Sequence, residues 1–172
     1  MTRPIQSLEK QTGAVLIVSL LFVFILALIG VSSTQTASLE LKMAANSRDK
    51  NLAFQSAEAA LVDAENYLNA TSALPDFDGS EAGLIQAAAP ESTPVWSSVG
   101  WQDSDSRSYS GTLEGVGEQP RYIVEELPPM PMPGGTLQSN VPLTEKGWYR
   151  ITARATGATS TANVLLQSVY KR

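Results

Sequence analysis

The sequence contains no cysteine and no histidine. Without cysteine the chain can form no disulfide framework and no thiolate site, and without histidine it lacks the commonest general base and metal ligand. It is also short of positive charge, with 12 Lys and Arg against 17 Asp and Glu, a formal net charge of −5. Such a chain offers few contacts to phosphates. These shortages disfavour an enzyme and a nonspecific nucleic-acid binder, and they favour a structural or interaction protein.

Proline is absent between Ile5 and Leu74, and the only glycines in that stretch are Gly13 and Gly30. Because proline and glycine are the main helix breakers, the stretch permits one very long helix. Residues 75–172, by contrast, contain a proline or glycine about every five residues. That spacing is typical of short strands joined by turns.

Charged side chains are absent between Lys10 and Glu40. Within this gap the segment Ala14 to Val31 is apolar apart from Ser19 and Gly30. As a helix the segment would be about 27 Å long, close to the hydrocarbon thickness of a bilayer. It is therefore predicted to cross a membrane.

The bases before this segment, Arg3 and Lys10, predict a cytoplasmic N-terminus and an outward-facing chain from Ser32 onwards. Three mechanisms fit the pattern. A secretory signal peptide could be cut at Thr36-Ala37, although the apolar run is longer than is usual for such peptides. The segment could instead be an uncut anchor, or it could follow a leader that is removed on the cytoplasmic side.

Gly13 lies at the junction between the polar leader and the apolar run. A short basic leader, MTRPIQSLEKQTG, followed by an apolar helix that continues without proline, resembles the N-terminus of type IV pilins. The resemblance implies that a prepilin peptidase cuts between Gly13 and Ala14 and that the new amine of Ala14 is methylated.

One position departs from the pilin pattern. Most pilins have glutamate as the fifth mature residue, where this chain has Val18. In the family that glutamate is thought to meet the N-terminal amine of a neighbouring subunit. Val18 cannot do so, while the Ala14 amine could still receive the glutamate of the next subunit. The departure therefore suggests a subunit placed first, at the filament tip; alternatively, Val18 is simply another lipid-facing residue.

Longer stretches narrow the resemblance to PilX-type minor pilins. Three of them resemble the N-terminal region of that family and two resemble its last two strands: Glu40 to Asn46, Arg48-Asp49 and Leu52 to Leu61, then Tyr149 to Ala155 and Leu166 to Tyr170.

The second part of the predicted helix has apolar residues at steps of three and four, which places them on one face. They are Phe54, Ala57, Leu61, Ala64 and Leu68. A helix over residues 14–70 would be about 85 Å long, so a domain of ordinary size can cover only part of it. The remainder must contact lipid or other helices.

Strand patterns follow in the last third of the chain. Residues 149–155 alternate between apolar and polar side chains, and a turn at Gly157 to Ser160 leads into a second strand, NVLLQSVYKR. Arg121 to Leu127 gives a third strand, and Val95 to Trp101 is a further candidate. The predicted fold class is α+β, a type IV pilin fold in which the second half of a long N-terminal helix packs on an antiparallel sheet.

Three further motifs could have a chemical role. Asp76, Asp78 and Glu81 could wrap calcium, although their spacing is not that of a complete EF-hand loop, and an acidic exposed turn explains them as well. The run from Leu127 to Gly135 could be a polyproline ligand or a stiff crossover. Five bases and no acid lie between Lys146 and Arg172, either as a patch for DNA or an acidic partner, or as solvent-facing residues that balance acidic loops. No nucleophile is marked, and no cofactor is predicted.

The predicted domains are a leader (1–13), the transmembrane and assembly half of the helix (14–36), its amphipathic half (37–73) and a globular sheet domain (74–172). The resemblance implies a minor pilin that primes pilus assembly, lies at or near the tip, and supports twitching motility and adhesion. Its implied partners are other minor pilins, the major pilin, a tip-associated adhesin, the prepilin peptidase and the inner membrane, with no nucleic acid. The alternatives are a minor pseudopilin of type II secretion and a membrane-anchored periplasmic binding domain that does not polymerise.

Overall fold

A computed structural model describes residues 12–128 and 147–172 of the chain. Residues 1–11 of the predicted leader, the proline-rich run from Pro129 onwards and Lys146 lie outside the described residues. The chain divides into two compact units, Met1–Ala45 and Asn46–Arg172.

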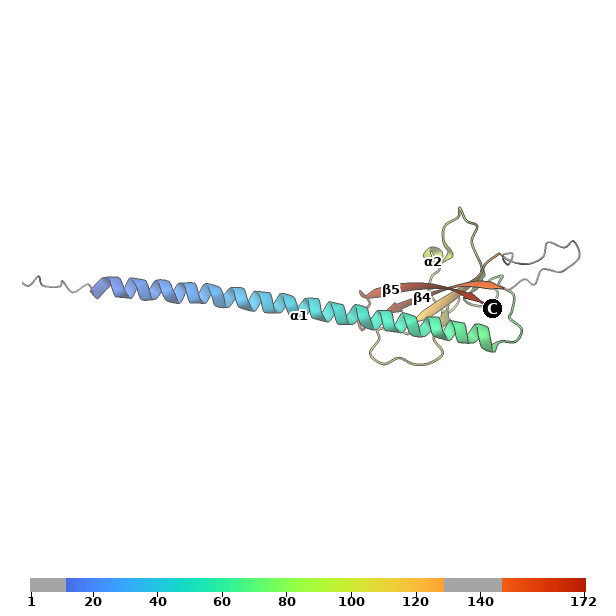
Figure 1. The fold of residues 1–172 in the computed structure, drawn as a ribbon, viewed down its shortest axis with the longest axis horizontal. Helices are drawn as coiled ribbons and strands as arrows, with labels where there is room; N and C mark the ends of the chain where they lie inside the picture. Colours follow the sequence, from blue (N-terminus) through green and yellow to red (C-terminus); the bar gives the residue numbers. More distant parts are fainter. Residues whose placement is uncertain (1–11, 129–146) are drawn as a thin grey trace, which may run out of the picture. The chain divides into compact units, whose positions relative to one another are not determined.

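A single helix, α1, runs from Thr12–Ala70 (Figure 1). This confirms the long helix predicted from the absence of proline. Gly30 does not interrupt it, and the hydroxyls of Thr34 and Thr36 donate to carbonyls three and four residues earlier. At its C-terminal end both the N–H and the hydroxyl of Thr71 donate to the carbonyl of Tyr67, at 3.2 and 2.8 Å. The helix ends at Ala70, five residues before Pro75, which could not continue a helix.

The sheet of the second unit contains five strands: β1 (Leu84–Gln86), β2 (Arg107–Ser108), β3 (Arg121–Glu126), β4 (Trp148–Thr156) and β5 (Asn163–Lys171). Their order is β1-β3-β4-β5, with β2 also paired to β3. The three strands predicted at the C-terminal side, β3 to β5, are confirmed. They pair antiparallel, but β1 pairs with β3 in parallel, so the sheet is mixed rather than wholly antiparallel.

The strand predicted over Val95 to Trp101 is wrong, because this segment contains a short helix, α2 (Val95–Ser98). Pro94 precedes it, and the hydroxyls of Ser97 and Ser98 donate to the carbonyls of Pro94 and Val95, at 2.8 and 3.0 Å. Local bonds of this kind offer the backbone an alternative to strand pairing.

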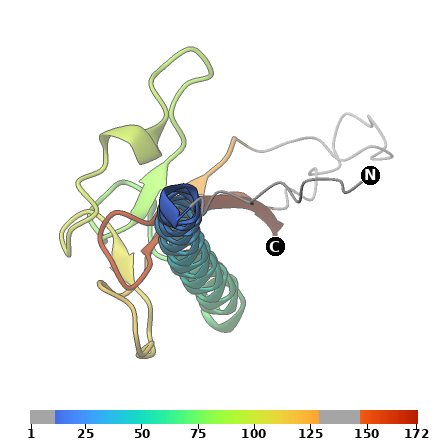
Figure 2. The same ribbon diagram turned by 90° about the vertical axis from the view of Figure 1, so that its left-hand side faces the viewer.

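The core of the second unit lies between α1 and one face of the sheet (Figures 1 and 2). The helix contributes a stripe of residues with no exposed surface: Ala53, Ala57, Ala60, Ala64 and Leu68. The sheet contributes Val124, Tyr149, Ile151 and Ala153. Four of the five helical residues are alanines, so the helix backbone can approach the sheet closely.

The predicted helical face is confirmed at Ala57, Ala64 and Leu68 and is wrong at Phe54, whose side chain is 43% exposed. Leu61 packs only at the margin of the core. The apolar pattern pointed to the large residues Phe54 and Leu61. The residues that are buried instead are Ala53 and Ala60, one position earlier in each case, because a small side chain lets the helix pack closely on the sheet.

Candidate functional site

The first candidate site is the apolar segment Ala14 to Val31 of α1. In the described residues this is the one helix long and apolar enough to cross a membrane. Its side chains lie exposed: Val15 is 71%, Val18 50% and Phe24 61% exposed. The hydroxyl of Ser19 donates to the carbonyl of Leu16 at 2.9 Å, so its polar group is satisfied within the helix, as a hydrocarbon environment requires. The segment can therefore enter lipid or a bundle of apolar helices.

The predicted processing residues lie at the start of this helix. Gly13 and Ala14 belong to its first turn, and a Cβ built on Gly13 meets no atom within 4 Å. Among the described residues the space around Gly13 is thus open, and packing there does not explain the glycine.

A second group of residues joins α1 to the turn between β4 and β5. Asp49 accepts hydrogen bonds from the N–H of Ala158, at 2.6 Å, and from both the N–H and the hydroxyl of Thr159. The Thr159 hydroxyl bond is the main cause that lowers the pKa of Asp49 below its ordinary value. Gly157 comes so close that a Cβ there would lie 2.8 Å from Cγ of Asp49. We call this set the Asp49 contact.

The chain has no cysteine, so no disulfide can hold the C-terminal strands. Polar contacts between the end of β5 and the end of α1 hold them in addition to the Asp49 contact. The Tyr170 hydroxyl donates to Oδ1 of Asn69, and the Arg172 guanidinium donates to the carbonyl of Thr71. These bonds fix the end of β5 to the end of α1. No local pattern predicts these bonds, because the residues of each pair are 101 positions apart.

The outer face of the sheet, turned away from α1, carries the polar residues of β3 and β4. The strand register places Arg150 opposite Glu125 and Thr152 opposite Ile123. Ile123, Glu125 and Thr152 have no exposed surface, so this outer face is partly buried.

Arg150 pairs with the buried Glu125. Its Nη2 and Nε donate to the two carboxylate oxygens at 2.6 and 2.9 Å. The hydrogen bonds to Glu125 are the main cause that raises the pKa of Arg150 above its ordinary value. The prediction that Arg150 balances acidic loops from the solvent is therefore corrected: its partner is a buried carboxylate on the neighbouring strand.

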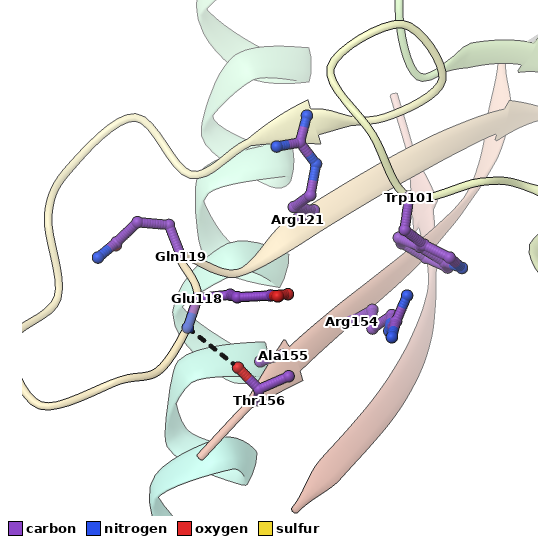
Figure 3. Close-up of a pocket in the computed structure, with 7 residues that line it drawn as sticks. All are labelled: Trp101, Glu118, Gln119, Arg121, Arg154, Ala155 and Thr156. Carbon is purple, nitrogen blue, oxygen red and sulfur yellow. Dashed lines mark hydrogen bonds between the residues drawn. The ribbon is translucent and has the colours of Figure 1, made fainter. Parts of the chain in front are cut away.

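Arg154 lies at a hollow on the same outer face (Figure 3). Its guanidinium carbon is 5.8 Å from the centre of the Trp101 ring, and the carboxylate of Glu118 points toward the two (Figure 3). Trp101 has a positive φ of 53°, an uncommon conformation for a bulky residue. In the described part of the chain no carboxylate lies within ion-pair distance of Arg154. Arg154 is thus held against an indole rather than by an acid.

The remaining C-terminal bases are dispersed. Lys171 lies 5.1 Å from the centre of the Trp148 ring, and Arg172 bonds the end of α1. Arg121 lines the same hollow as Arg154, its cross-strand partner, and it pairs with Asp103 at 2.7 Å and bonds Ser106. Apart from these two, the bases named here lie at separate places, so the geometry lends no weight to a DNA-binding patch.

The calcium candidate forms a turn that leads into β1. Oδ1 of Asp78 accepts the N–H of Ser80 at 2.9 Å, and hydrogen bonding from the side chain of Ser80, together with this N–H, lowers the pKa of Asp78. Asp76 and Asp78 line a hollow on the surface, which Glu81 does not line. Among residues 12–128 and 147–172 no three acidic side chains are grouped so that they could hold a metal. Calcium binding at Asp76, Asp78 and Glu81 gains no support from this geometry.

An exposed apolar helix that continues into the core helix of a sheet unit is a pilin-like arrangement, and it defines the chain as a helix-anchored structural subunit. Comparison with protein families agrees. The model described as type IV pilus assembly protein PilX C-term matches residues 41–172, and the model described as PilX N-terminal matches residues 12–62.

The chain therefore belongs to the PilX family of type IV pilus assembly proteins, a structural rather than a catalytic family. Comparisons with curated proteins and with solved structures gave no match.

Proposed function

We propose that this chain is a minor pilin that helps to prime type IV pilus assembly and lies at or near the pilus tip, and so supports pilus biogenesis, twitching motility and adhesion. The observation that carries the proposal is the exposed apolar segment 14–31 at the start of a helix whose later residues form the core of a PilX-family sheet unit. A segment of this kind can pass from lipid into a bundle of similar helices without exposing apolar surface to water.

In this proposal the precursor spans the inner membrane with its N-terminus in the cytoplasm and its sheet unit in the periplasm. The prepilin peptidase cuts between Gly13 and Ala14, and the mature chain then enters the pilus. The open space around Gly13 supports the cut, because a peptidase can approach a backbone that bears no side chain.

Val18 supports the place at the tip. An unpaired charge at membrane depth costs about 3 kcal/mol, so a pilin glutamate gains by pairing with a neighbour's amine. Val18 makes no such pairing and needs none, which suits a subunit with no neighbour ahead of it. The partners in this proposal are other minor pilins, the major pilin and a tip-associated adhesin.

Mass spectrometry of the mature N-terminus tests the processing. We expect a chain that begins at methylated Ala14. Gly13→Leu should block the cut, because it places a side chain at the junction that the peptidase recognises. Gly30→Leu is the matched control and should leave the cut unchanged, since Gly30 lies away from the junction in the same helix, with similar open space around it. A wild-type chain that begins at Met1 would indicate an uncut anchor, and one that begins at Ser38 would indicate a signal peptide. Either result would contradict the proposed function.

A further inference from the structure

The free edge of β5 is the feature that the proposed function leaves unused. β5 is the last strand of the sheet order, and in the described residues it pairs only with β4. It is nine residues long and contains no proline and no glycine. Natural edge strands are usually short, or are interrupted by proline, charge or a bulge, because an open edge can pair with another chain. This edge lacks those devices over most of its length.

Two backbone hydrogen bonds show which groups of β5 point to this edge. The N–H of Arg172 donates to the carbonyl of Gly147, and the N–H of Gly157 donates to the carbonyl of Ala162, at 3.0 and 2.8 Å. Both pairs continue the register that sets Ile151 opposite Ser168. Since bonded and non-bonded pairs alternate in an antiparallel ladder, the even-numbered residues of β5 bond to β4.

The odd-numbered residues Leu165, Gln167 and Val169 therefore direct their N–H and C=O groups to the free edge. Their side chains lie on the outer face of the sheet, opposite Arg154, Thr152 and Arg150. Leu165 is 38% and Val169 58% exposed. The edge thus offers backbone donors and acceptors beside two exposed apolar side chains.

Charge and direction indicate what pairs there. The register sets Leu165 opposite Arg154, which has no carboxylate within ion-pair distance in the described residues. Arg150, opposite Val169, is already paired with a carboxylate, and β5 itself contains no acid. The Leu165 end of the edge is therefore complementary to an acidic strand. A second copy could pair its own β5 with this β5 in antiparallel fashion, about a twofold axis. Residues 46–70 of the two helices would then also run antiparallel, so the two chains would enter their sheet units from opposite ends. Two chains anchored in the same membrane cannot do this.

We propose that β5 accepts an extended, acidic segment of a neighbouring pilus subunit, which adds to the sheet at Leu165, Gln167 and Val169. Strand addition of this kind takes its affinity from backbone hydrogen bonds and its selectivity from alternate side chains. The inference rests on the proposed function and deepens it, because it assigns the surface that selects a neighbour.

Hydrogen exchange tests the edge directly. Exchange is measured for the full chain in two states. In the first the chain is produced alone and kept in detergent micelles; in the second it is isolated in complex with the other pilus subunits from the cells that naturally make it. The amide hydrogens of Leu165, Gln167 and Val169 should exchange at least tenfold more slowly in the complex. Those of Leu166 and Ser168 bond to β4 and should be protected in both states. Equal exchange of the odd-numbered amides in both states would overturn the proposal.

A matched pair of variants separates the backbone from the side chain. Gln167→Pro and Gln167→Ala both lose the side-chain bond to Thr152, but only proline removes the N–H at the free edge, and it breaks no bond to β4. Incorporation into sheared pili should fall at least tenfold for Gln167→Pro and stay near wild type for Gln167→Ala. Equal melting temperatures of the two variants show that folding is not the cause. Equal incorporation of both variants would refute strand addition.

A third variant tests the occupant, because Gln167→Cys would be the sole thiol in the chain. A disulfide-linked homodimer formed on oxidation in cells would place a second copy at the edge and would overturn the proposal. A wild-type chain absent from pili would contradict the proposed function instead, and hydrogen exchange in the inner-membrane complex of the subunits would then decide the edge.

Discussion

Glu125 is a carboxylate with no exposed surface on the outer face of the sheet. Such a group is tolerated only with a charged partner, and Arg150 supplies two hydrogen bonds to it. A buried pair of this kind contributes little net stability by itself, because the cost of desolvating both ions offsets their attraction. The loss of one partner, however, leaves a buried charge without compensation.

We therefore expect Arg150→Met to lower the free energy of unfolding by about 3 kcal/mol, since Glu125 stays buried and loses its partner. The double variant Glu125→Leu, Arg150→Met should recover most of this loss. Denaturant unfolding of the full chain in detergent measures both. Arg154→Met is the matched control, because Arg154 lies on the same strand and the same face without a carboxylate partner in the described residues. If the double variant were less stable than Arg150→Met, the pair would be a net stabiliser.

The sequence alone did not reveal the partner of Arg150. The alternation over residues 149–155 correctly predicted that Tyr149, Ile151, Ala153 and Ala155 face the core. It could not show that the other face is partly buried, because that depends on which side chain lies opposite on β3. Cross-strand register, and not periodicity, pairs Arg150 with Glu125.

At the scale of elements, the Asp49 contact joins α1 to the turn between β4 and β5 over 109 positions of sequence. Gly157 makes this approach possible, because a Cβ there would also lie 2.5 Å from the carbonyl oxygen of Asp49. The turn itself was predicted from its glycine and small residues, but its attachment to α1 was not.

Asp49→Asn should lower the melting temperature at neutral pH, because it removes the charge that accepts three hydrogen bonds. The folded state lowers the pKa of Asp49 below the ordinary value of 3.8. This contribution is therefore present above that value and is lost as the pH falls through the lowered pKa. The difference between the wild type and Asp49→Asn should be constant from neutral pH to about pH 5 and should narrow as the pH falls below 3.8.

Melting curves across this pH range measure the difference, and hydrogen exchange at Ala158 reports the contact itself. The Ala158 amide should exchange faster in Asp49→Asn than in the wild type. Asp78→Asn is the control, because Asp78 bonds Ser80 within its own turn and should leave exchange at Ala158 unchanged. A melting difference that does not shrink as the pH falls below 3.8 would contradict the role of the ionised carboxylate.

At the scale of the whole molecule, the chain has one unit with exposed apolar surface and one unit with an ordinary core. An isolated apolar helix of this length has no stable place in water, so the first unit needs a membrane or neighbouring helices. This requirement follows from the residues themselves and agrees with the family to which the chain belongs.

Labelling of pili with antibodies tests the position of the chain in the filament. Wild-type chain should be found at the tip. Val18→Glu should allow incorporation along the filament, because the new carboxylate can pair with the amine of a neighbouring Ala14. Val23→Glu, which adds the same charge at another exposed position of the same helix, should not. Wild-type chain spread evenly along sheared filaments would contradict the tip position.

The long helix, the apolar segment long enough to cross a membrane and the three C-terminal strands could all be predicted from the amino-acid sequence. These depend on local properties: the absence of proline, the absence of charge and the alternation of side chains. Tertiary structure decided the alanine stripe of α1, the parallel pairing of β1, the Arg150 pair and the Asp49 contact. Each of these depends on which distant residues become neighbours, and no local pattern carries that information.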